Sequence, residues 1–218
     1  MALFPLATRA AQLRPYRWLI GTILLIDVAV LLLAAWIYVG PGPAAQATAR
    51  FLFEGFSATQ LLIAGFVGLV GTRRAPHRAF WRVLSGGLLV LAVDNYVDVH
   101  EHLGKWLTHA AGIVPSRDVV ASPDDLLTIA YGVVGVLLLV RFRRALRVRS
   151  AAITLLYLAV GFSALMLVCD SWPQGRLEAI EQPAQLLGGG FFLLTMAIHT
   201  HTRVRLTRLP GHGGASRL

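Results

Sequence analysis

The hydrophobic residues of this chain fall into six long runs that are separated by short polar segments. The runs are rich in Leu, Val, Ala and Gly and lack the strict alternation of a β-strand. A helix needs about 20 apolar residues to cross the hydrocarbon core of a bilayer, so the pattern predicts an all-α bundle of six transmembrane helices. The predicted helices are Trp18–Val39, Gly55–Gly71, Val83–His102, Pro123–Val140, Ala151–Cys169 and Pro183–His201.

Proline, glycine and capping residues mark the ends of these runs. Pro41-Gly42-Pro43 ends the first helix and begins a loop, and Ser122-Pro123-Asp124-Asp125 has the residue order of a helix start. Pro183 marks the start or a kink of the last helix, and Trp106–Ala111 is expected to form a short surface helix. Residues 1–203 therefore form the predicted transmembrane domain, and the Gly- and Arg-rich residues 204–218 form a tail that we expect to be disordered.

The composition excludes an ordinary soluble domain. Hydrophobic residues make up 56% of the chain and charged residues only 14%, with a mean hydropathy of +0.65. Helices of this composition must face lipid. We therefore expect a multi-pass protein of the cell inner membrane, for which the lipid bilayer is the first partner.

The basic residues predict the orientation. Of the 20 lysines and arginines, 16 lie before the first run or after the second, fourth and sixth runs. The positive-inside rule then places both termini in the cytoplasm. The arginine clusters are expected to bind anionic lipid headgroups, so the net charge of +9 does not indicate nucleic-acid binding. A homo-oligomer is compatible with this arrangement.

Ten of the eleven acidic residues gather at the opposite, outer side of the predicted bundle. Carboxylates at membrane depth are costly and need protons, cations or strong donors. The ten are Glu54, Asp94, Asp98, Glu101, Asp118, Asp124, Asp125, Asp170, Glu178 and Glu181.

The third run carries the densest candidate site. At 3.6 residues per turn, Asp94, Asp98, Glu101 and His102 share one helix face, whereas His100 points elsewhere. Asp94 lies roughly 18 Å above the inner boundary, near the midplane. Carboxylate and imidazole ligands suit Zn, Fe or Mn, and carboxylates alone suit Ca or Mg. The alternative is that Glu101 and His102 are only the solvated end of the helix.

Acids from the fifth and sixth runs are expected at the same level. Asp170 and Glu181 would complete a metal site across the bundle. Glu54, Asp124, Asp125 and Glu178 are either helix-capping residues or part of the site, and the sequence does not separate these roles.

Asp27 stands alone inside the first run, with no basic residue at its depth. It is expected to face the bundle, either protonated or bonded to a side chain such as Gln60 or Thr195. A proton-relay role is the functional alternative.

In the third run, Asp94-Asn95 is followed after four residues by His100-Glu101. This pattern resembles the third helix of uncharacterised bacterial six-helix membrane proteins, in which an Asp-Asp pair is followed after four residues by His-Glu. Glu178, Glu181 and Gly188 are similar to a later part of that pattern. The resemblance implies the same six-helix fold but no activity, and Asn95 replaces its second aspartate.

Three functions are compatible with these patterns. The leading hypothesis is a membrane protein with an outward-facing carboxylate/histidine cation or metal site, including a metal-dependent membrane hydrolase. The second is a cation or proton transporter or channel that uses Asp94 and Asp27. The third is a non-catalytic assembly or sensing subunit. No P-loop, nucleophile elbow, HExxH or CxxC motif indicates a particular enzyme.

Overall fold

The structure is a computed structural model, and it describes residues 13–40, 42–72, 77–110, 123–147, 150–170 and 178–208. The described residues are helical and contain no strand, which confirms the all-α prediction. A 3-10 turn, η1 (Arg14–Tyr16), comes first. The α-helices are α2 (Arg17–Tyr38), α3 (Pro43–Gly71), α4 (Arg78–Val97), α5 (Val99–Ala110), α6 (Pro123–Arg141), α7 (Arg143–Leu146), α8 (Ala151–Asp170) and α9 (Glu178–Arg208).

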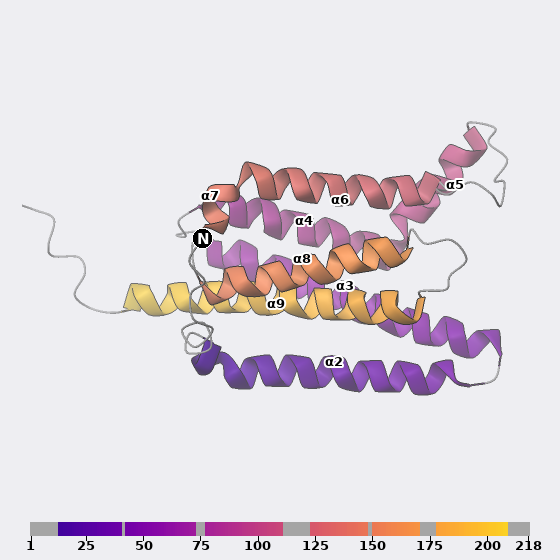
Figure 1. Cartoon of the computed structure of the whole chain (residues 1–218), viewed down its shortest axis with the longest axis horizontal. Helices are drawn as coiled ribbons and strands as arrows, with labels where there is room; N and C mark the ends of the chain where they lie inside the picture. Colours follow the sequence, from indigo (N-terminus) through magenta and orange to yellow (C-terminus); the bar gives the residue numbers. More distant parts are fainter. Residues whose placement is uncertain are drawn as a thin grey trace, which may run out of the picture.

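The long helices lie side by side and alternate in direction along the chain (Figure 1). The start of α2 and the end of α9 lie at one end of the bundle, together with α7, while α5 lies at the other end. Each of α2, α3, α4, α6, α8 and α9 corresponds to one of the predicted runs.

Helix α9 is the central element of the bundle. Its main packing partners are α3 and α8, and α3 also packs along α4. Leu156 of α8 and Leu194, Met196 and Ile198 of α9 are almost completely inaccessible to solvent. Together with Leu88 of α4 they belong to the main hydrophobic core, so α9 is enclosed by protein on several sides.

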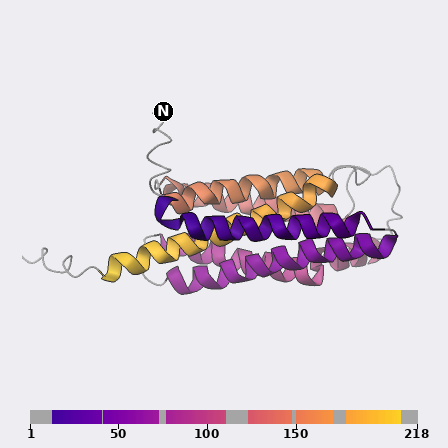
Figure 2. The same cartoon turned by 90° about the horizontal axis from the view of Figure 1, so that it is seen from below.

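Helix α2 lies on the outside of the bundle (Figures 1 and 2). Only Ile23, Asp27 and Ala34 of this helix are buried. Trp18 and Trp36, near its two ends, are 78% and 76% exposed. The helix rises about 27 Å from Trp18 to Trp36, which is close to the thickness of a hydrocarbon core and matches the interfacial positions that tryptophan prefers.

Three helices in the described part of the chain are long and apolar enough to cross a membrane: Arg14–Tyr38, Pro43–Gly71 and Ala151–Cys169. Ile129–Arg141 of α6 is a shorter apolar helix. These helices are compatible with a membrane protein.

Two predicted boundaries were wrong. Helix α3 begins at Pro43 rather than at Gly55, because Gly42 takes a positive φ of 98° and Pro43 occupies the first turn, where its missing N–H costs nothing. The third run is not one helix but two, α4 and α5, with a break at Asp98. Helix α9 starts at Glu178 and holds Pro183 inside it. It continues to Arg208, and the rest of the predicted tail lies outside the described residues.

Candidate functional site: a carboxylate–imidazole pair at a helix break

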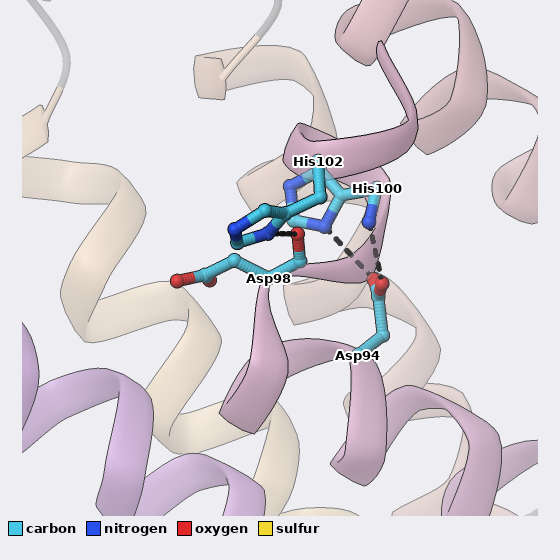
Figure 3. A network of polar contacts seen from close by, with 4 residues as sticks. All are labelled: Asp94, Asp98, His100 and His102. Atoms are coloured by element: carbon cyan, nitrogen blue, oxygen red, sulfur yellow. Dashed lines mark hydrogen bonds and ion pairs between the residues drawn. The ribbon is translucent and has the colours of Figure 1, made fainter. Parts of the chain in front are cut away.

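The candidate site is formed where the chain leaves α4 and enters α5. Asp98 adopts a left-handed backbone conformation, with φ 52° and ψ 44°, and ends α4. Aspartate is one of the few non-glycine residues that enter this region readily. The reversal turns the chain so that His100, two residues later, comes back over the end of α4 (Figure 3).

Asp94 accepts two hydrogen bonds from residue 100. The backbone N–H of His100 donates to Asp94 Oδ1 at 2.9 Å, and Nδ1 of the His100 ring lies 2.9 Å from Asp94 Oδ2. The side chain of Asp94 is only 7% exposed, while that of His100 is 25% exposed. The carboxylate therefore caps the first turn of α5 and orients the imidazole at the same time.

The predicted stripe of Asp94, Asp98, Glu101 and His102 required an unbroken helix, and the helix breaks at Asp98. The Asp98 carboxylate points away from Asp94 (Figure 3). His102 Nδ1 lies 2.8 Å from the backbone carbonyl oxygen of Asp98 rather than near Asp94. The histidine that meets Asp94 is His100, which the helical spacing had directed elsewhere.

Other predicted site residues are placed only in part. The side chains of Glu101, Asp124, Asp125, Asp170 and Glu178 lie outside the described residues, as does all of Asp118. Glu181 is half-buried near the start of α9. Within the described part of the chain, no group of three or more His, Cys, Asp or Glu side chains could hold a metal ion.

A surface pocket of about 370 Å³ adjoins the pair. Among the described residues, Asp94 contributes the acidic group of this pocket and Tyr131 of α6 contributes its hydroxyl. The remaining lining is aliphatic, from Leu89, Val90, Val93 and Val99. Such a pocket can receive an apolar group beside a carboxylate.

Asp27 lies in a separate, fully buried position. Gln60 Nε2 donates to Asp27 Oδ1 at 2.6 Å, so Asp27 faces the bundle and Gln60, one of the two partners named from the sequence, lies beside it. Thr195, the alternative partner, instead donates to the Phe191 carbonyl.

Two further polar groups have structural partners. Glu54 accepts a hydrogen bond from Arg50 Nε at 2.6 Å, one helical turn earlier. His199 is buried and stacks on Trp81 with 3.8 Å between ring centroids. It is therefore an interior residue of the bundle.

Sequence reasoning missed the role of His100. A signal was present, because Asp94-Asn95 and Asp98 are residue types that leave the helical conformation more easily than their neighbours. A helix break at any of these three residues changes which later side chains lie close to Asp94.

Comparison with known proteins identifies one family. Residues 3–200 match a family described as a domain of unknown function, DUF8692. No curated protein and no solved structure gives a significant match.

Proposed function

We propose that this chain, which belongs to the DUF8692 family, is a polytopic integral membrane protein with an outward-facing cation site at Asp94 and His100. The observation that supports the proposal is the buried Asp94 carboxylate holding both the backbone N–H and the ring Nδ1 of His100. The cation is a proton or a divalent metal ion, and both bind at the same imidazole nitrogen.

The geometry favours Nε2 of His100 as the binding atom. A carboxylate beside Nδ1 favours the tautomer with the proton on that nitrogen, so the lone pair lies on Nε2. A nitrogen in this state accepts a proton or ligates a metal ion. Asp94 is then the orienting residue rather than a metal ligand, which differs from the role that the sequence suggested.

Six spans and an outward-facing site follow from the charge distribution. If all six long helices cross the membrane, 16 of the 20 basic residues lie on the side of the two termini. The positive-inside rule makes that side cytoplasmic and puts the α4–α5 break at the outer side. The arginines would then contact anionic headgroups of the inner leaflet.

Nitrogen NMR of the histidine rings tests the site directly. The full chain is reconstituted in nanodiscs, and His100 is assigned by the His100→Gln variant. We expect the neutral ring to carry its proton on Nδ1, and we expect its Nε2 signal to move on acidification or on addition of Zn²⁺ or Mn²⁺. A response to acid alone identifies a proton site, and a response to the metal as well identifies a metal site.

Two aspartate variants give the contrast. Asp94→Ala removes the orienting carboxylate, so the tautomer preference of His100 should disappear. Asp98→Ala removes a neighbouring carboxylate that points away from the pair, so the preference should persist. The other groups facing this region, His102 and Tyr131, remain in both variants. An unchanged His100 tautomer and cation response in Asp94→Ala would overturn the proposal.

A further inference from the structure

Asp27 is a buried polar residue in α2, a helix that is otherwise apolar and largely exposed. It is 1% exposed, whereas its neighbours Leu25 and Val28 are 69% and 47% exposed. Ile23 and Ala34 are the other buried residues of α2. The inward face of α2 therefore presents one carboxyl group to the bundle.

Helices α3 and α9 enclose this carboxyl group closely. Gln60 of α3 is bonded to Asp27 Oδ1. On the other side, a methyl group added to Gly190 of α9 would collide with Asp27 Oδ2, and one added to Gly189 would lie 2.6 Å from Gln60 Oε1. The glycine pair brings the α9 backbone directly against both polar side chains. Little space is left for an ion larger than a proton.

Two buried oxygen atoms lack partners in this arrangement. Neither Asp27 Oδ2 nor Gln60 Oε1 has a hydrogen-bond partner within the described part of the chain. A charged carboxylate with a single donor is unfavourable in such surroundings. The two residues together have more acceptors than donors, and a proton corrects the imbalance.

The bond length is compatible with a neutral acid. A half-turn of the Gln60 amide exchanges its oxygen and nitrogen without moving other atoms. Asp27 would then donate its O–H to the Gln60 carbonyl. The 2.6 Å separation falls within the range of about 2.5–3.0 Å for O–H···O bonds.

Polar residues connect this pair with the end of the bundle where α9 begins. Ser57, one turn from Gln60 on α3, donates to the Gln185 carbonyl of α9 at 3.4 Å. Gln182, one turn further towards the start of α9, is buried and its Oε1 lacks a partner within the described residues. Ser57, the backbone carbonyl of Gln185 and the side chain of Gln182 form a polar strip where α3 and α9 pack together.

We propose that Asp27 and Gln60 form an internal proton-binding site, in which Asp27 is a neutral acid bonded to Gln60 and exchanges its proton with the outer side along the strip of Ser57, Gln185 and Gln182. This site is separate from Asp94 and His100 and does not depend on them. It holds α2 against α3 and α9 as long as the proton is bound.

The groups that face Asp27 do not themselves titrate. Among the described residues they are Gln60 and the α9 backbone at Gly190, while Gly189 and Ser57 lie beside Gln60. The nearest acids on the packed helices are Glu54, about 9 Å from Gln60 along α3, and Glu181, about 13 Å from Gly190 along α9. The protonation of Asp27 should therefore be separable from that of other acids.

Infrared difference spectroscopy of the full chain in nanodiscs at neutral pH tests this site. Wild-type minus Asp27→Asn should contain the C=O band of a protonated carboxylic acid, and the band should shift in D₂O. Asp94→Asn serves as the matched control, since it replaces another buried acid, and it should retain the band. A difference spectrum that contains only carboxylate bands would overturn the proposal.

A second variant keeps the test informative if Asp27→Asn does not fold. Gln60→Leu leaves Asp27 in place and removes its partner, so the acid band should move to the higher frequency of a carboxyl group without a hydrogen bond. A band at the same frequency in Gln60→Leu would contradict the assigned pair.

Discussion

Two non-glycine residues in the described part of the chain, His77 and Asp98, adopt the left-handed backbone conformation. His77 precedes α4, and Asp98 ends it. A left-handed L-residue typically costs about 1–2 kcal/mol, and aspartate tolerates the conformation better than most. At Asp98 the local cost is offset by the two hydrogen bonds that the turn allows between His100 and Asp94.

Substitution of Asp98 tests this backbone requirement. Asp98→Gly should keep the free energy of unfolding or raise it by up to about 1 kcal/mol, because glycine has no Cβ to clash in this region. Asp98→Val should lower it by about 1–2 kcal/mol, because a β-branched residue is strained there. The midpoint of SDS-induced unfolding measures both. A valine variant as stable as the glycine variant would contradict the conformation of Asp98.

The two buried acids show how far residue-level prediction extends. The burial of Asp27 followed from the cost of a lone carboxyl group in an apolar run, which does not depend on helix details, and Gln60 was one of two partners named for it. The partner of Asp94 depended on one backbone angle at Asp98. Helical periodicity cannot predict that angle, so it selected His102 instead of His100.

At the scale of helices, glycines decide how closely α3 approaches its neighbours. A Cβ on Gly68 would collide with Ser85 of α4 and lie 2.9 Å from Met196 Sδ of α9. A Cβ on Gly55, in the same helix, would meet nothing within 4 Å. The close packing of α3 against α4 and α9 therefore depends on small residues at particular positions.

Alanine substitutions at these two glycines should have opposite effects. Gly68→Ala should lower the free energy of unfolding by about 1–3 kcal/mol through overpacking. Gly55→Ala should leave it unchanged or raise it by about 0.5–1 kcal/mol, because alanine is the better helix former. Chemical unfolding in mixed micelles measures both, and equal effects at the two positions would contradict the packing of α3.

The helices themselves were largely predictable, because long apolar runs indicate helices whatever their partners. The ends of the helices were less predictable. The first turns of α3, from Pro43 to Arg50, are rich in alanine, and their helix was not recognised because Gln46, Thr48 and Arg50 interrupt the apolar pattern. The central position of α9 was also hidden, since its glycines, glutamines and histidines look like interruptions until α3 and α8 are seen to cover them.

For the whole molecule, the alternating direction of the helices predicts on which side of the membrane each connection lies. Single cysteines can report this in a Cys169→Ser background, since Cys169 is the only cysteine in the chain. The exposed positions Val39, His77, Trp106 and Arg147 sample four successive connections.

We expect a membrane-impermeant maleimide to label Val39→Cys and Trp106→Cys in intact cells. His77→Cys and Arg147→Cys should react only after the membrane is permeabilised, because the positive-inside rule predicts that the basic segments are cytoplasmic. The reverse pattern would overturn the orientation. A pattern that does not alternate would overturn the six-span topology.

The two exposed tryptophans of α2 have a consequence for where this protein can reside. If α2 crosses a bilayer, their spacing of about 27 Å would set a preferred length for the lipid tails around an edge helix with few buried residues. In a thicker bilayer the rings would be drawn below the headgroups, and in a thinner one α2 would have to lean. Hydrophobic mismatch would then act first on α2, the helix that carries Asp27. The length of the acyl chains would therefore influence how α2 packs on the interior of the bundle, without any ligand.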